Sequence, residues 1–184
     1  MNQLFRIEKS FKVPDGTKVS PFLNAKDIFS DLPFEFLDGF SIAAGEIQSH
    51  VDSKIHILPI VTQVTFVFEG QVNIRMKEPG QTEPYVIRVG AGEAVLTRSG
   101  TFFQLSNQFE YPCRVLYIVS PAYVFLVEND KVLYDDALVL ERNWSELTDI
   151  DPTALYTLEQ YQRNRASALN RIKFLKSGSS SESQ

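Results

Sequence analysis

The segment SKIHILPIVTQVTFVFEG, residues 53–70, contains two short runs that are rich in β-branched, aliphatic and aromatic residues. The runs KIHIL and QVTFVF have the length and composition of β-strands, and a Glu-Gly turn signal follows the second run. Because side chains alternate along a strand, His56 and Leu58 should face the same side of the first strand. Gln63 and Thr65 should likewise share one face of the second strand. We therefore expect a histidine and a glutamine to lie together in the interior of a β-domain.

Short runs of the same kind continue through residues 41–140, and turn residues separate them at regular intervals. The breaks are Glu69-Gly70, Pro79-Gly80, Gly90-Ala91-Gly92, Ser99-Gly100, Tyr111-Pro112 and Asn129-Asp130. This spacing is typical of consecutive β-hairpins. It predicts an all-β domain over residues 41–140, built as a closed or double-sheet barrel.

The flanking segments have a different composition. Residues 1–40 contain three prolines among scattered phenylalanines, so we expect an irregular arm whose aromatic side chains pack on the barrel. Residues 151–176 begin with Asp-Pro, a good helix start, and continue with apolar residues at helical spacing. This predicts a basic C-terminal helix that either docks on an acidic barrel or across a dimer, or recruits another partner. Residues 177–184, SGSSSESQ, have the composition of a disordered tail.

The composition excludes several classes of protein. A chain of 184 residues with 43% apolar residues suits one domain with a sizeable core, and its net charge of −5 does not favour binding to nucleic acid or to an anionic membrane. No apolar run approaches the roughly 18 residues that span a bilayer, and the N-terminus lacks the apolar region of a secretory signal. A single cysteine, Cys113, cannot form an intramolecular disulfide. We expect a cytoplasmic protein without nucleic-acid or membrane partners.

The segment GEAVLTRSGTFFQLSN, residues 92–107, resembles the second motif of the cupin superfamily, written G-x5-P-x-G-x2-H-x3-N. Three residues stand at their motif positions: Gly92, Gly100 and Asn107. Arg98 stands where proline is usual, and Phe103 stands where the metal-binding histidine is usual. The glycine frame of the motif is therefore present without its metal ligand.

The first segment resembles the second half of the other cupin motif, H-x-H-x(3,4)-E-x6-G. His56 falls on the first histidine and Gly70 on the closing glycine, but Leu58 and Gln63 stand where histidine and glutamate are usual. Two degenerate motifs in the right order imply a double-stranded β-helix, the cupin or jelly-roll barrel, over about residues 40–125. The resemblance also implies small-molecule binding and a homodimer, and many cupins hold a divalent metal such as iron or manganese.

The usual cupin ligand set of three histidines and one glutamate cannot form here, since the chain has only two histidines. A displaced set, His50, Asp52 and His56, offers two imidazoles and a carboxylate, which suits Fe(II). Six residues along an extended strand span roughly 20 Å, however, so the chain would have to reverse between the histidines. We therefore expect no metal cofactor and keep a displaced iron or manganese site as the alternative.

His56 is the candidate catalytic acid or base, because an imidazole with a pKa near 6.5 exchanges protons at neutral pH. The alternative is a core histidine that hydrogen-bonds to Gln63 or another neighbour. Six side chains are the candidate substrate contacts: Leu58, Gln63, Thr65, Phe103, Asn107 and Tyr117. Tyr123 is a further candidate pocket hydroxyl. Asp135 and Asp136 are adjacent, so they should face opposite sides of a strand rather than act as a pair.

Three functions remain open on this basis. The first is a metal-independent isomerase, epimerase, cyclase or lyase that acts on a small organic metabolite in the barrel. The second is a non-catalytic ligand-binding or structural module, and the third is a metal-dependent dioxygenase that uses the displaced site. We favour the first, because a barrel interior with one polar and one apolar end has the usual anatomy of a ligand pocket.

Overall fold

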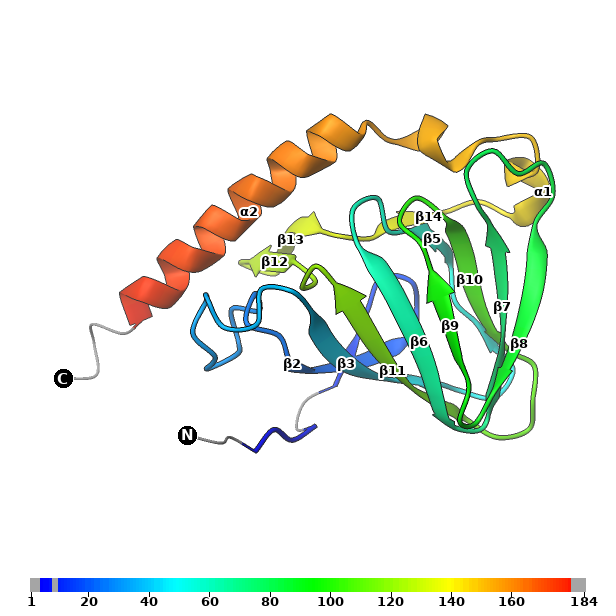
Figure 1. The fold of residues 1–184 in the computed structure, drawn as a ribbon, viewed down its shortest axis with the longest axis horizontal. Coiled ribbons are helices and arrows are strands. Elements are labelled where there is room, and N and C mark those ends of the chain that lie inside the picture. The colour runs from blue at the N-terminus through cyan, green and yellow to red at the C-terminus, as the bar shows by residue number, and fades with distance from the viewer. Residues whose placement is uncertain (1–3, 8–9, 180–184) are drawn as a thin grey trace.

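The computed structural model describes residues 4–7 and 10–179, and its centre is a barrel of two antiparallel sheets (Figure 1). The first sheet contains, in spatial order, β1 (Phe11–Lys12), β2 (Lys18–Leu23), β3 (Ser41–Ile47), β11 (Cys113–Ser120), β6 (Thr62–Glu69) and β9 (Ala94–Thr97). The second sheet contains β14 (Leu138–Leu140), β5 (Ile55–Ile57), β10 (Phe102–Asn107), β7 (Gln71–Lys77) and β8 (Tyr85–Gly90), and β4 (Val51–Asp52) pairs with β10. A separate hairpin is formed by β12 (Phe125–Glu128) and β13 (Lys131–Asp135).

The main core lies between the two sheets, and the strands supply it by alternation. Along β6 the side chains of Gln63, Thr65 and Val67 are buried, while the residues between them are more exposed. The neighbouring strand β11 alternates in the same way and places Tyr117 opposite Thr65. The expected common face of Gln63 and Thr65 is therefore present.

Part of the arm, which we expected to be irregular, is a regular strand. Residues of β2 pair with β3 and thereby extend the first sheet. Pro21 argues against a strand because proline cannot donate to the ladder. It is accommodated because the register shifts between Pro21 and Leu23, and because the short strand β1 pairs only with Lys18 and Val19.

The C-terminal segment begins differently from the prediction. Asp151 caps a short 3-10 helix (Pro152–Leu155), and the long helix α2 (Leu158–Ser179) starts only after the extended residue Tyr156 has interrupted the helical path. A single turn of helix, α1 (Trp144–Leu147), precedes both. Among the described residues, no helix is long and apolar enough to cross a membrane. Of the predicted tail, residues 177–179 belong to α2 and residues 180–184 lie outside the described part of the chain.

Helix α2 docks beside the barrel of its own chain, next to the hairpin β12–β13 (Figure 1). Its buried residues Ala168 and Ile172 pack against Val124, Leu126 and Tyr134. Its basic side chains also have partners within the chain: Arg165 with Asp136, Arg171 with Glu128, Lys173 with Glu35, and Lys176 with the carbonyl groups of Ala25, Asp27 and Ser30. Docking on the barrel therefore accounts for the basic character of the helix.

Candidate functional site

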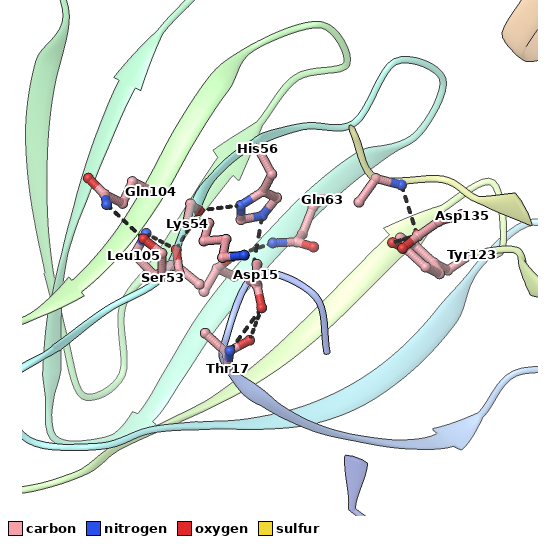
Figure 2. Close-up of polar contacts among 12 residues, drawn as sticks. Asp15, Thr17, Ser53, Lys54, His56, Gln63, Gln104, Leu105, Tyr123 and Asp135 are labelled. Atoms are coloured by element: carbon pink, nitrogen blue, oxygen red, sulfur yellow. Dashed lines mark hydrogen bonds and ion pairs between the residues drawn. The ribbon is translucent and has the colours of Figure 1, made fainter. Parts of the chain in front are cut away.

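A cavity of about 310 Å³ lies at the mouth of the barrel, between the first sheet, β5 and the turn at residues 13–17 of the arm. Its walls are mostly apolar and include Leu58 and Val119. Polar groups gather in two places, which Figure 2 shows apart from each other. We call Asp15, His56 and Gln63 the histidine cluster, and Tyr123 with Asp135 the tyrosine–aspartate pair.

The arm contributes Asp15 through a tight turn. The N–H of Gly16 donates to the carbonyl of Val13 at 2.9 Å, and Gly16 has a φ of 93°, a backbone conformation that glycine adopts readily. The Asp15 carboxylate is fixed by Thr17, whose N–H and hydroxyl both donate to Oδ1, at 2.9 and 2.8 Å. The N–H of Lys54 donates to the carbonyl of Asp15 at 2.7 Å and ties the turn to the barrel beside β5. The second carboxylate oxygen of Asp15 is thereby directed toward His56 (Figure 2).

His56 is buried, and its two ring nitrogens have different surroundings. Nδ1 lies 3.0 Å from the carbonyl oxygen of Lys54, which can only accept, so Nδ1 carries the proton of the neutral ring. Nε2 then bears the lone pair and lies 4.0 Å from Oδ2 of Asp15, which is longer than a hydrogen bond. The lone pair of Nε2 is therefore open to a group that enters the cavity.

Burial lowers the pKa of His56 below its ordinary value of 6.5, while the charge of Asp15 and the contact with the Lys54 carbonyl raise it. Burial is the largest of these effects, so the imidazole is neutral at pH 7. When it accepts a proton, the nearby Asp15 carboxylate stabilises the imidazolium that forms. This combination is that of a general base with a built-in counter-ion.

Gln63 is not the hydrogen-bond partner of His56. Its side-chain amide donates instead to the hydroxyl of Thr65 at 3.1 Å, along the same strand. The Phe103 ring packs against the imidazole, with ring centroids 3.9 Å apart. His56 is thus held by the hydrogen bond to the Lys54 carbonyl and by the tilted ring contact with Phe103.

Tyr117 lines the cavity, and its buried hydroxyl group has no partner among the described residues. Its ring packs closely over Gly45, where an added Cβ would collide with it. The residue is 7% exposed, and its hydroxyl makes no hydrogen bond among the described residues. Burial raises the pKa of Tyr117 far above 10, so the hydroxyl remains protonated at neutral pH.

We expect Tyr117→Phe to stabilise the ligand-free protein by about 1 kcal/mol, because it removes a buried hydroxyl whose hydrogen-bonding capacity is unused. Urea denaturation of the two proteins measures this difference. Tyr111→Phe is the matched control, since Tyr111 is 79% exposed and its replacement should change stability by less than about 0.5 kcal/mol. Destabilisation by Tyr117→Phe would show that the hydroxyl has a partner in the folded protein.

The tyrosine–aspartate pair lies on the segment that leads into and out of the hairpin β12–β13. The hydroxyl of Tyr123 donates to Oδ1 of Asp135, and the N–H of Ala137 donates to the same oxygen at 2.9 Å. Ser41 accepts from the N–H of Tyr123, and Asn24 donates to its carbonyl, which fixes the tyrosine backbone. Burial raises the pKa of Asp135 to about 6, although both hydrogen bonds oppose the shift.

The structure brings only part of the predicted substrate contacts to the cavity. Leu58, Gln63 and Tyr117 line it, together with His56 and Tyr123. Three predicted contacts do not line it: Thr65, Phe103 and Asn107. Thr65 supports Gln63, and Phe103 supports His56.

Asn107 has a different role from the one predicted. Its amide nitrogen donates to the carbonyls of Ile47 and Tyr111, and its oxygen accepts from the N–H of Phe109. All three hydrogen bonds fix backbone groups near the end of β10. Asn107 is therefore a structural residue that stabilises a loop.

The displaced metal set is not assembled. The His50 side chain is 59% exposed and lies near Glu110, whereas His56 is buried in the barrel. Asp52 accepts from Ser106 and Gln108 on the outside of the second sheet. Among residues 4–7 and 10–179, no three His, Cys, Asp or Glu side chains lie together in a way that could hold one metal ion.

The motif positions themselves do not fit a divalent cation either. They carry one imidazole, one neutral amide, one aliphatic side chain and one phenyl ring: His56, Gln63, Leu58 and Phe103. The amide of Gln63 supplies no charge to offset the desolvation of an ion, and Asp15 is already fixed by Thr17. These four side chains do not supply the ligand set of a divalent cation.

Sequence reasoning missed Asp15 and assigned no role to Asp135. Pro14-Asp15-Gly16 is a recognisable turn signal, but nothing in the sequence places this turn against β5. The alternation argument for the aspartates was right, since Asp135 lines the cavity while Asp136 faces Arg165. It did not identify which of the two aspartates faces the cavity.

No family model matches the sequence and no curated protein is detectably similar to it, so the comparisons with solved structures carry the assignment. Oxalate decarboxylase is similar with a TM-score of 0.55 at 11% identity, over 72% of this chain and 30% of that chain. The capsular polysaccharide assembling protein CapF from Staphylococcus aureus gives 0.51 at 13% identity, over 77% of this chain and 32% of that chain. A domain of CENP-C from Drosophila melanogaster gives 0.50 at 10% identity, over 61% of this chain and 72% of that chain.

This chain thus spans about a third of the first two proteins and most of the CENP-C domain. Together with the two-sheet barrel, these similarities confirm the predicted cupin fold, the double-stranded β-helix. Identities this low show the fold alone.

Proposed function

We propose that this cupin-fold protein is a metal-independent enzyme that holds a small, partly apolar organic molecule in its barrel and moves a proton on it. The observation that carries the proposal is the state of His56: a buried, neutral imidazole with Nδ1 fixed and with the lone pair of Nε2 open to the cavity beside Asp15. The reaction classes that need such a base are isomerisation, epimerisation, cyclisation and elimination.

The proton transfer follows from this arrangement. Nε2 of His56 accepts a proton from a carbon next to a carbonyl group, so that a C–H bond breaks, an N–H bond forms and the electron pair remains on the substrate as an enolate. The nearby Asp15 carboxylate stabilises the imidazolium that forms. Return of the proton to a different carbon gives an isomer. Alternatively, the electron pair of the enolate forms a C=C bond while a leaving group on the next carbon departs with the pair of its own C–X bond, which gives an elimination product.

Hydrogen exchange with solvent deuterium tests this proposal on a mixture of metabolites, so the substrate need not be chosen in advance. The protein is incubated in D₂O and EDTA with the small-molecule extract of its own organism, and mass spectrometry monitors which compounds gain deuterium. We expect at least one compound to exchange at a rate that EDTA does not change, because His56 and not a metal removes the proton. Loss of exchange in EDTA with recovery on Fe(II) or Mn(II) would contradict the proposal and favour a metal enzyme.

The non-catalytic alternative shares the same cavity and is separated by the same experiment. A ligand-binding module would retain a compound from the extract through gel filtration but would not label it with deuterium. That outcome would overturn the proposed catalysis while keeping the cavity as a binding site.

A further inference from the structure

We infer that the molecule held in the barrel carries a protonated amine, which binds at Asp135 while the rest of the molecule extends toward His56. The inference rests on the proposed function only for the position of the reacting end. The binding of the cation depends on the tyrosine–aspartate pair and can be tested on its own.

The charges that line the cavity are mostly negative. Three aspartates line it: Asp15, Asp27 and Asp135. Among the described lining residues, Lys12 is the only lysine or arginine, and its side chain lies exposed on the short outer strand β1. A ligand carboxylate or phosphate would therefore meet like charges without an interior cation to offset its desolvation.

Asp135 lines the cavity beside Tyr123, apart from His56 (Figure 2), and one of its carboxylate oxygens is unused. Its Oδ1 accepts from Tyr123 and Ala137, whereas no donor among the described residues reaches Oδ2. The adjacent Asp136 is different, because Arg165 pairs with it inside the protein. No ion pair links a described lysine or arginine to Asp135, so its charge remains available to pair with a cationic group of a ligand.

Two further features of the cavity suit an organic cation. Tyr123 and Phe125 line it beside Asp135, and aromatic faces attract ammonium groups. The volume of about 310 Å³ is at the lower end of the range for ligand pockets, roughly 300–1,000 Å³, and indicates a small molecule.

Three probes of similar shape test the inference: 2-phenylethylamine, 2-phenylethanol and 3-phenylpropanoate. Calorimetry at about pH 8, in EDTA, measures their affinities while Asp135, with its pKa near 6, is ionised. We expect the amine to bind roughly 10- to 100-fold more tightly than the alcohol, and the carboxylate to bind more weakly than both. Asp135→Asn should lower the affinity for the amine by a similar factor and leave the affinity for the alcohol unchanged.

Asp130→Asn is the matched control, because it removes the same charge from the exposed turn of the hairpin, where φ is 60° and asparagine is well tolerated. It should change neither affinity. Equal or tighter binding of the alcohol or the carboxylate, or amine binding that Asp135→Asn does not affect, would overturn the inference, as would the absence of binding by all three probes. An amine-selective cavity that catalyses no deuterium exchange would support this inference and contradict the proposed catalysis, so the two can fail separately.

Discussion

Replacing Asp136 with alanine is expected to lower the free energy of unfolding by about 3–5 kcal/mol, the usual cost of removing one partner of a buried ion pair. The Asp136 side chain has no exposed surface and accepts from the N–H of Val124, the hydroxyl of Tyr134 and the guanidinium of Arg165. Its removal would leave three donors without their partner. The Arg165 side chain, only 13% exposed, would be a nearly buried cation without a counter-ion.

The same change should loosen the docking of α2. Arg165 also donates to the carbonyl of Ala122, so this single side chain joins the helix to the segment that enters the hairpin β12–β13. The other ion pairs of the helix are more exposed, and exposed pairs contribute little because water and salt screen them. The Asp136–Arg165 pair is therefore the most buried ion pair of the helix.

Urea denaturation of Asp136→Ala, of Arg165→Met and of the double variant measures the effect. The double variant should be less destabilised than the sum of the single changes, because removing both partners leaves no uncompensated charge. Asp149→Ala, at an exposed position with no hydrogen bond or ion pair among the described residues, is the control. If Asp136→Ala behaves like this control, the ion pair does not anchor the helix.

The fold was predictable because its signals are local. Turns that need a positive φ favour glycine, and Gly70 and Gly100 both have a φ of 80°. At Gly70 there is also no room for a side chain, since a Cβ would lie 2.8 Å from the carbonyl oxygen of Pro112. The motif glycines therefore indicate the path of the backbone. The residues at the metal-ligand positions indicate only which side chains fill the barrel.

The site was predictable only where it follows strand alternation. His56, Leu58 and Gln63 lie on strands or beside them, and all three line the cavity as expected. Asp15 reaches the cavity through a contact between the arm and β5, which are about 40 residues apart, and no local pattern encodes such a contact. The contacts of Lys77 in the core could not be predicted either. Strand alternation does not indicate that its buried ammonium group donates to the carbonyls at the end of α1.

His56→Asn is expected to lower the rate of deuterium exchange by about 10²- to 10⁴-fold, the usual contribution of a positioned general base. The side-chain amide of asparagine can still donate to the Lys54 carbonyl, as Nδ1 of His56 does, but it offers no basic nitrogen at the position of Nε2. The variant therefore removes the base while it keeps the bond that the imidazole makes to the barrel. Circular dichroism and thermal unfolding would establish that the fold is intact.

The matched control is His50→Asn, which makes the same replacement at an exposed position where φ is 57° and asparagine is well tolerated. It should leave the exchange rate unchanged. Because exchange needs the neutral imidazole, the rate should fall as the pH falls through the pKa of His56, which burial places below its ordinary 6.5. A wild-type profile with no acidic limb, or an exchange rate that survives His56→Asn within about tenfold of the wild type, would remove His56 from the reaction and leave the cavity as a binding site only.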